Sequence, residues 1–413
     1  MPPDILLQRV EEICRLLEQR DSLINAFLPE TGRRERLKKQ AQQLIDRYPA
    51  QKPLLYGLLA GIKDIYNVEG MPTRAGSQLP EEAFIGEESS LVTMLKALGV
   101  LIVGKTVSTE FAYFQPGETR NPIDPNHSPG GSSSGSAAAV AAGFCDFSIG
   151  TQTIASVIRP AAYCGIVGFK PSYGIFPLDG VLPFSQSADH PGFFSLSIDA
   201  MIRIMKALLP GWKDEETDEP TLGIPSEYFL GQANAEARAA FQESRNKLVS
   251  SGCREIETTV FEDIESINKL HQDLIAREFY LNHEQLYSSY GSLYSQPSKD
   301  LFHKGKAIPD YRADQARTEQ KRIRQQVSET MRDTGIKLWI SPSTTSAAPR
   351  GLESTGSPLM SLPFTFCGLP SITIPHGKSA HGLPFGIQIS AEFLKDHYLL
   401  NAAKHITNKL FTG

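Results

Sequence analysis

The chain has 413 residues, of which 40% are hydrophobic and 21% are charged, and its formal net charge is −5. This composition is that of an ordinary globular protein with enough apolar material for a large core. Because the charge creates no broad positive field, we expect no nucleic acid as the main ligand.

The cysteines and the N-terminal residues favour a cytoplasmic protein. Five cysteines are scattered along the chain without a Cys-x-x-Cys pair, which argues against a disulfide framework or a zinc site and suits a reducing compartment. The sequence MPPDILLQRVEEICRLL at the N-terminus contains early acidic residues and does not resemble a signal peptide. Aliphatic segments such as 100–103 are far too short to span a bilayer, so we expect no membrane association.

Elements of an α/β core are predicted along the first half of the chain. Helical spacing of apolar residues at 4–27 and at about 33–48 predicts a helical N-terminal arm. The apolar run 54–65 is expected to enter the core, and it carries Lys63 near its end. There follow a predicted helix at 90–98, a buried strand at 101–103, an alanine-rich helix at 136–142 and a short strand at 147–150. This alternation of strands and helices favours an α/β fold.

The second half of the chain begins with a polar, acidic stretch at 211–221. A strand is expected to open after it, and Asn234 is a suitable N-cap for a helix that ends near Ser250. The span from about 261 to 335 is charged and helical in pattern. Strands are predicted again at 337–341, 371–375 and 385–390. We therefore expect one large core that is interrupted by a helical segment.

The segment SPGGSSSGSAAAVAAG, residues 128–143, is dense in serine and glycine and allows several interpretations. It fits the spacing of a phosphate-binding loop, but the lysine that must follow is absent. It also fits the nucleophile elbow of α/β-hydrolases, with Ser133 at its centre, but the preceding NPIDPNHSP contains three prolines and cannot be the required strand. A flexible linker is a third interpretation, although the segment leads directly into a helix. Histidines that would serve an elbow follow only late in the chain, at His376, His381, His397 and His405.

Three segments taken together closely resemble the amidase signature family. They are GIKD at 61–64, the serine-rich segment 128–143, and GTQTIASVIRPAAYCGIVGFKPSYG at 150–174. Further segments are similar to that family in the same order, namely LINAF at 23–27, GKTVSTEFA at 104–112, TRNPIDP at 119–125 and PFTFCGLPSITIPHGKSAHGLPFGIQI at 363–389. The resemblance implies an α/β fold with a large mixed β-sheet flanked by α-helices on both sides.

This resemblance covers nearly the whole chain and implies a single domain over 1–413. Within it we expect a helical N-terminal arm at 1–50, a catalytic core at 54–210, a variable helical segment at 211–335 and a return to the core at 336–413. The resemblance also implies assembly as a homodimer.

The resemblance further implies a Ser-Ser-Lys triad in which no histidine takes part. The lysine of GIKD is Lys63, the first serine after the paired glycines is the relay Ser132, and the serine before VIRP is the nucleophile Ser156. A serine hydroxyl is a weak nucleophile and needs a base within hydrogen-bond reach. Lysine can be that base only when neutral, which burial among apolar residues favours. By the same resemblance, a cis peptide bond precedes Ser132, and the oxyanion hole consists of the backbone N–H groups of Thr153, Ile154, Ala155 and Ser156.

The sequence departs from the common form of the family just before the nucleophile. Gln152 stands in place of Asp, and Ile154 and Ala155 stand in place of two glycines. Because Gln152 is neutral, position 152 lacks the negative charge of Asp, which could pair with Arg159. We expect a structural role for Arg159. Ile154 is expected to narrow the acyl pocket. Further candidates for substrate contact are Ser133, Tyr113 and Phe114.

These features predict an amidohydrolase for a small-molecule substrate with an amide, ureido or related C–N bond. The reaction would pass through an acyl-enzyme on Ser156 and would need no metal or organic cofactor.

Two alternatives to this function stay open. One is the glutaminase subunit of an amidotransferase, which feeds ammonia to a partner enzyme, although the chain is short for that role. The other is a non-catalytic scaffold on an amidase fold, against which the presence of Lys63, Ser132 and Ser156 argues.

Overall fold

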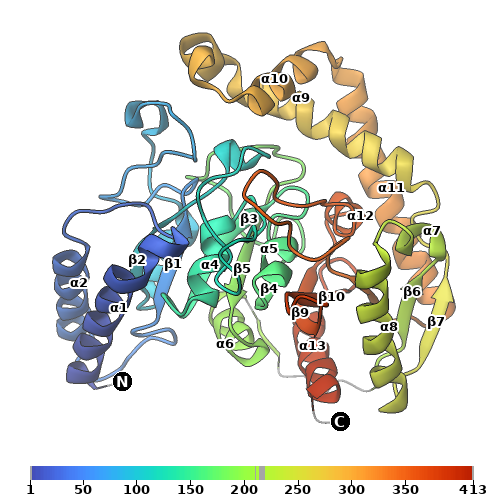
Figure 1. Ribbon diagram of the computed structural model, residues 1–413, viewed down its shortest axis with the longest axis horizontal. Coiled ribbons are helices and arrows are strands. Elements are labelled where there is room, and N and C mark those ends of the chain that lie inside the picture. Colours follow the sequence, from blue (N-terminus) through green and yellow to red (C-terminus); the bar gives the residue numbers. More distant parts are fainter. Residues whose placement is uncertain (1, 210, 214–218, 412–413) are drawn as a thin grey trace.

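A ten-stranded mixed sheet forms the centre of the protein, whose computed structural model describes residues 2–209, 211–213 and 219–411. The strands lie in the order β2-β1-β3-β5-β4-β9-β10-β8-β6-β7 (Figure 1). Their bounds are β1 Leu59–Lys63, β2 Leu101–Thr106, β3 Phe147–Gln152, β4 Val167–Lys170, β5 His190–Ser195, β6 Leu222–Pro225, β7 Glu255–Thr258, β8 Leu338–Pro342, β9 Ser371–Lys378 and β10 Pro384–Ser390.

Both strand orientations occur in this sheet, which confirms the mixed α/β fold that the resemblance implied. β1 pairs in parallel with β2 and with β3. The neighbouring strands are antiparallel in the pairs β3–β5, β5–β4, β4–β9, β9–β10 and β10–β8. Strand β6 is parallel to both of its neighbours, β8 and β7. Because β1 and β3 are parallel neighbours, their carboxyl ends lie at the same edge of the sheet.

Helices cover both faces of the sheet. Leu101 and Val103 of β2 pack in an apolar cluster with α1, α2 and α4, whereas Val100 and Ile102 belong to the larger cluster that contains α3 and α6. Successive side chains of a strand point to opposite faces, so these two clusters lie on opposite sides. The helices named here are α1 Pro3–Ile24, α2 Arg33–Arg47, α3 Ser90–Ala97, α4 Ser134–Ala141 and α6 Ile198–Leu208.

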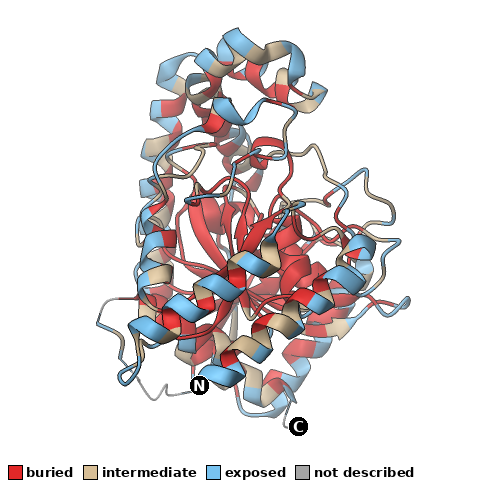
Figure 2. Ribbon diagram, turned by 90° about the vertical axis from the view of Figure 1, so that its left-hand side faces the viewer, coloured by how far each residue is buried: buried red, intermediate tan, exposed pale blue. Residues whose placement is uncertain are grey.

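The two N-terminal helices pack against each other, and α2 packs against β2. The buried residues of α1 recur at intervals of three, four or seven positions, which gives the helix one apolar side; they are Leu6, Val10, Cys14, Leu17 and Ile24. Figure 2 shows these inward sides in red and the outward sides in pale blue. The helix predicted for 4–27 ends earlier, at Ile24, because Asn25 adopts the left-handed conformation with a φ of 55°.

The remaining helices pack on the other half of the sheet or extend from it. Those that pack on strands are α5 Ile158–Tyr163, α8 Ala235–Ser250 and α13 Asp396–Phe411. The long helices α9 Ile264–Tyr290, α10 Gln296–Ala307 and α11 Asp310–Thr334 form a group in which α9 packs on both others, and Figure 1 shows α9 and α10 projecting above the sheet. Two short helices are α7 Glu227–Leu230 and α12 Leu362–Phe366.

Several predicted elements match the structure closely. Asn234 caps α8, and its side chain accepts a hydrogen bond from the backbone N–H of Ala237. The helical pattern of 261–335 corresponds to α9, α10 and α11. The short strands β4, β5 and β7 were not predicted from the sequence. Of the acidic stretch predicted at 211–221, residues 214–218 lie outside the described residues.

Candidate active site

Three segments converge at the edge of the sheet where β1 and β3 end. Lys63 is the last residue of β1. Ser132 lies in the loop that precedes α4, and α4 packs on β1, β2 and β3. Ser156 lies in the short loop between β3 and α5. The three residues of the expected triad are therefore brought to one place by segments that are far apart in the sequence.

The side chain of Lys63 is fully buried and contacts two hydroxyl groups. Its Nζ lies 2.8 Å from Ser132 Oγ and 2.9 Å from Thr151 Oγ1. The neighbouring carboxylate of Asp64 forms a buried ion pair with Lys105 at 2.8 Å instead. Within the described part of the chain, no carboxylate forms an ion pair with Lys63. Burial lowers the pKa of Lys63 to about 7, and the negative charge of Asp189 partly opposes that shift.

Ser132 and Ser156 line the same small cavity. Both are buried, Ser132 at 3% and Ser156 at 7% exposure. Over the described ranges, their hydroxyls are not hydrogen-bonded to each other. The Gly131–Ser132 peptide bond is cis, as the resemblance implied. The candidate relay and nucleophile thus line one small space, and the candidate base contacts the relay directly.

The loop from Thr153 to Ser156 borders this cavity, which Thr153, Ile154 and Ser156 line. The four backbone N–H groups of this loop donate to no acceptor among the residues that the structure describes. The side chain of Thr153 donates a short hydrogen bond to Asp189 Oδ1. Burial raises the pKa of Asp189 to about 6, while this hydrogen bond acts in the opposite direction. Unpaired N–H groups beside a serine are suited to bind a developing oxyanion.

Gln152 stabilises the start of the helix that follows Ser156. Its Oε1 accepts hydrogen bonds from the backbone N–H groups of Val157 and Ile158, at 2.8 and 3.0 Å. Its Nε2 donates to Thr365 Oγ1 at 2.9 Å. An amide oxygen at this position therefore satisfies two buried donors without a negative charge.

Arg159 binds groups other than the side chain at position 152, so these two positions are not paired in this structure. Its buried guanidinium donates to the carbonyl oxygens of Gly356 and Gly131, at 2.7 and 2.6 Å, and to Thr355 Oγ1 at 3.2 Å. These bonds join the loop around 355–356 to the loop that carries Ser132. The structural role expected for Arg159 agrees with this placement.

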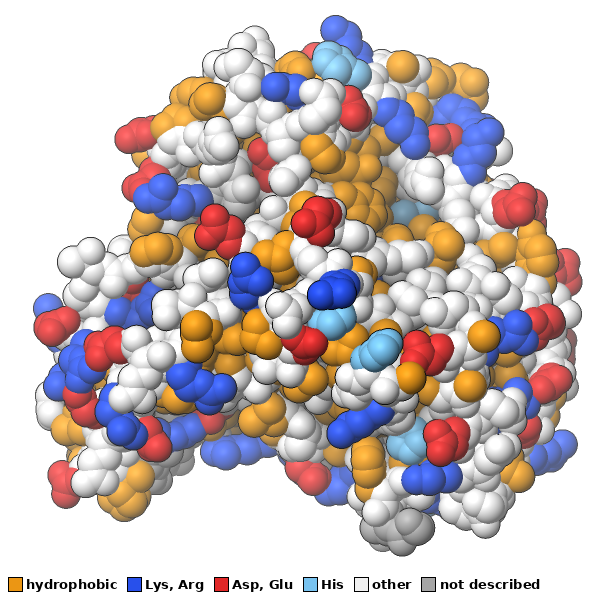
Figure 3. Space-filling view, viewed as in Figure 1, with side chains coloured by type: hydrophobic (Ala, Val, Ile, Leu, Met, Phe, Trp, Pro, Cys, Tyr) orange, Lys and Arg blue, Asp and Glu red, His pale blue; other side chains and the backbone are white. Residues whose placement is uncertain are grey.

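Aromatic and aliphatic side chains form the walls of the cavity. Tyr113 and Phe114, both expected to contact substrate, lie in its lining together with Ile154 and Phe184. The rings of Tyr113 and Phe184 are stacked, with centroids 5.7 Å apart and planes at 22°. Figure 3 shows hydrophobic side chains in the hollow between the α9–α10 hairpin and the rest of the molecule. Next to Ser156 the cavity is small, and the polar residues Ser132, Thr153 and Arg159 line it as well.

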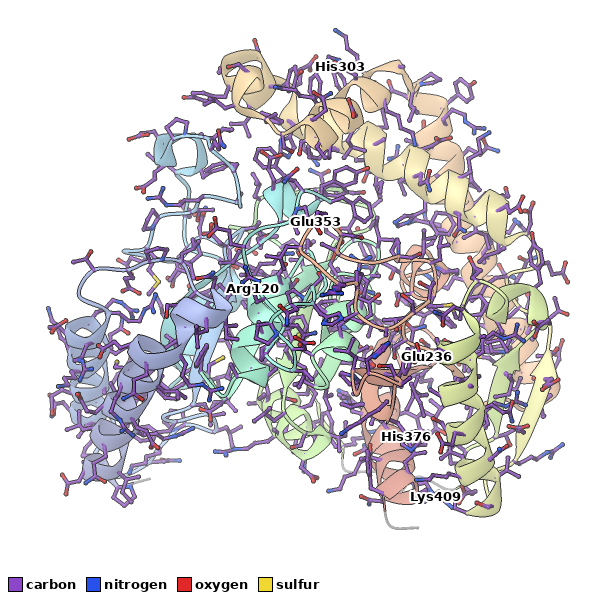
Figure 4. The ribbon with its side chains drawn as sticks, viewed as in Figure 1. Arg120, Glu236, His303, Glu353, His376 and Lys409 are labelled. Atoms are coloured by element: carbon purple, nitrogen blue, oxygen red, sulfur yellow. The ribbon has the colours of Figure 1, made fainter. Side chains whose placement is uncertain are left out.

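Ser133 lies outside the cavity lining, although the sequence suggested contact with substrate. Its side chain is fully buried, and its Oγ donates to the backbone oxygen of Thr151 at 3.2 Å. None of the late histidines contacts it among the described residues. The side chain of His376 binds Ser244 Oγ at 2.6 Å and lies near α13 and α8. Figure 4 shows this histidine well away from the loop above α5, in which Glu353 is labelled. The elbow interpretation of Ser133 therefore finds no support, because it lacks both an exposed serine and a base.

Three residues near the triad were not singled out in the sequence. Thr151 belongs to the same GTQT segment as the oxyanion loop, and the parallel pairing of β1 with β3 brings it to Lys63. Phe184 and Asp189 lie in a segment without a recognisable motif, so no sequence signal identified them. No group of three or more His, Cys, Asp or Glu side chains suited to a metal ion occurs among the described residues. No described helix is long and apolar enough to cross a membrane.

Comparison with known proteins gives matches over most of the chain. The family model described as Amidase matches residues 8–400. A glutamyl-tRNA(Gln) amidotransferase subunit of Koribacter versatilis is 28% identical over 463 aligned residues, which cover 97% of this chain and 94% of that protein. Amidase 1 of Oryza sativa subsp. japonica is 40% identical over 190 residues, or 44% of this chain and 43% of its own length. A crystal structure of an amidase is 29% identical with a TM-score of 0.87, covering 99% of this chain and 96% of the other.

Proposed function

Because this chain belongs to the amidase family, we propose that it is an amidohydrolase that cleaves an amide-type C–N bond of a small molecule through an acyl-enzyme on Ser156. In this proposal Lys63 is the base, Ser132 is the relay, and the backbone N–H groups of residues 153–156 form the oxyanion hole. The small cavity beside Ser156 favours a substrate with a compact acyl group.

The proposed reaction begins with attack of Ser156 Oγ on the carbonyl carbon of the substrate. The proton of Ser156 passes to Ser132 Oγ, and the proton of Ser132 passes to the neutral Nζ of Lys63. The carbonyl oxygen becomes negative in the tetrahedral intermediate and accepts hydrogen bonds from the loop 153–156. The C–N bond then breaks, and a proton returns along the same path to the departing nitrogen. Water attacks the resulting ester in the same manner, which releases the acid and restores Ser156.

The observation that carries this proposal is the contact of 2.8 Å between Lys63 Nζ and Ser132 Oγ in a buried site. Among the described residues, no carboxylate forms an ion pair with this lysine. A lysine that is paired with a carboxylate stays protonated and cannot accept a proton. Lys63 instead has two hydroxyl neighbours and a pKa of about 7, so a large fraction is neutral near physiological pH.

A fluorophosphonate probe tests the proposal directly, since it reacts with an activated serine even when the substrate is unknown. We expect the wild-type protein to be labelled at Ser156 and Ser156→Ala to lose both labelling and amide hydrolysis. Ser133→Ala is the control, because Ser133 is buried away from the cavity. Labelling that is lost in Ser133→Ala and kept in Ser156→Ala would contradict the proposal and support the elbow interpretation.

A second candidate function is that of a glutaminase subunit. It is favoured by the relatives named as subunits of glutamyl-tRNA(Gln) amidotransferase, which match most of the chain at 26 to 28% identity. Hydrolysis of glutamine and co-purification with a partner enzyme would support this candidate. Hydrolysis of other small amides by the isolated chain, with no effect of an added partner, would support the amidohydrolase.

A further inference from the structure

A buried carboxylate outside the expected triad, that of Glu278 in α9, gathers four hydrogen-bond donors around it. Glu278 is 7% exposed. Its oxygens accept from Ser185 Oγ at 2.6 Å, from Ser187 N at 2.9 Å and from Ser187 Oγ at 2.5 Å. The fourth donor is Arg317 Nη1 of α11, at 2.8 Å. We propose that Glu278 is a positioning residue, which holds the loop 184–189 and thereby sets the geometry of the oxyanion loop and of one cavity wall.

The loop 184–189 connects this carboxylate to the reacting centre. Asp189 Oδ2 accepts hydrogen bonds from the backbone N–H groups of Phe184 and Ser185, at 2.8 and 2.9 Å. The other oxygen of Asp189 accepts from Thr153 Oγ1, at the start of the oxyanion loop. A displacement of Ser185 would therefore be transmitted through Asp189 to Thr153. The role of Glu278 rests on the proposed function, in which the N–H groups of 153–156 bind the oxyanion.

The same loop supplies a wall of the substrate cavity. Phe184 lines the cavity, and its ring stacks on Tyr113 and packs against Phe279, the neighbour of Glu278 in α9. Asn282 Nδ2 donates to the backbone oxygen of Phe184 at 3.2 Å, and Gln320 Nε2 of α11 donates to that of Ser187 at 3.1 Å. The helices α9 and α11 thus hold this loop at more than one point.

The donor set explains why a carboxylate is required at position 278. Four donors converge on two oxygens, and a carboxylate offers acceptor sites only. Glutamine has nearly the same shape but replaces one oxygen with an NH₂ group, which would face a donor and leave it unpaired. Hydrogen bonds to an ionised group are also about twice as strong as neutral ones. E278Q should therefore disturb Ser185, Ser187 or Arg317 without creating a void.

A second ion pair joins the same two helices and offers a matched control. Asp273 of α9 and Arg312 of α11 lie 2.9 Å apart, which is close to the 2.8 Å of the Glu278–Arg317 pair. Within the described ranges, Asp273 makes no hydrogen bond to the loop 184–189. If Glu278 acted only by joining α9 to α11, then D273N and E278Q would have similar effects.

The experiment compares wild type, E278Q and D273N, each as the full chain. The readouts are the second-order rate constant of labelling by a fluorophosphonate, and kcat and KM for acetyl and benzoyl anilides. We expect E278Q to lower the labelling rate about tenfold or more, because the N–H donors are displaced from the oxyanion position. The ratio of kcat/KM between the two anilides should also change, since Phe184 moves. D273N should differ from wild type by less than about twofold in both readouts.

Two results would overturn the inference while leaving the proposed function intact. One is labelling of E278Q at the wild-type rate, and the other is an equal loss in E278Q and D273N. Absence of labelling in wild type would instead contradict the proposed function itself. If E278Q does not fold, Ser185→Ala combined with Ser187→Ala removes the hydroxyl donors of the loop and keeps the ion pair with Arg317. That double variant should reproduce the loss of labelling, and wild-type labelling in it would overturn the inference.

Discussion

Lowering the pH from about 8 to about 6 should slow the acylation of Ser156 about tenfold, because Lys63 must be neutral to accept a proton. Burial lowers the pKa of Lys63 to about 7, and the charge of Asp189 partly opposes this shift. With that pKa, about nine-tenths of the lysine is neutral at pH 8 and about one-tenth at pH 6. Asp189 has a pKa of about 6, so its protonation at lower pH removes a charge that favours the ammonium form and makes the decline less steep.

The assay is the rate of fluorophosphonate labelling between about pH 5.5 and about pH 8.5, measured on wild type, Lys63→Ala and Lys170→Met. Lys170 is the matched control, because burial lowers its pKa to about 7 as well. Its Nζ donates to the backbone oxygens of Leu369 and Pro171, away from the cavity. Lys170→Met should keep the decline at acidic pH. Lys63→Ala should label about 10² to 10⁴ times more slowly at pH 8, with little dependence on pH.

The assignment of Lys63 as the base would be refuted by either of two results. One is a wild-type labelling rate that is the same at both pH values. The other is a Lys63→Ala variant that keeps both the rate and the decline at acidic pH. Loss of the decline in Lys170→Met, with the fold intact, would assign the titration to Lys170 instead.

Two further predictions concern the residues that distinguish this chain from the common form of the family. Ile154→Gly should raise kcat/KM for benzoyl anilides relative to acetyl anilides by about tenfold, since Ile154 lines the cavity next to Ser156. An unchanged ratio would show that Ile154 does not limit the size of the acyl group. Gln152→Ala should lower the free energy of unfolding by about 1 to 3 kcal/mol, because the buried N–H groups of Val157 and Ile158 lose their acceptor. A urea titration with the same midpoint as wild type would contradict this prediction.

Local sequence patterns predicted the elements that have a strong period or a clear cap. The helix α8 begins directly after Asn234, as expected, because a side-chain acceptor at the N-cap acts within a few residues. The long helices of 264–334 follow the apolar spacing of their own residues. By contrast, β4 and β5 have only four and six residues, and they become strands by pairing with β9 and β3. Such pairing partners are distant in the chain, and a local pattern does not specify them.

The sequence by itself determined the types and the order of the residues expected to react, together with the family. It did not distinguish Ser132 from Ser133 by local pattern, because they are neighbours of the same type. The structure separates them, since Ser132 Oγ lies 2.8 Å from Lys63 Nζ while Ser133 turns toward the backbone of Thr151. The tertiary structure also lowered the pKa of Lys63 to about 7, since this shift arises from burial by segments far apart in the chain.

The contacts of the helical segment were likewise revealed only by the tertiary structure. Glu278 lies in the variable helical segment 211–335, and no motif surrounds it. Its contacts with Ser185 and Ser187 join positions that are 93 and 91 residues apart in the sequence. Burial and hydrogen bonding depend on which segments approach each other in the folded chain, so a spacing along the sequence cannot reveal them.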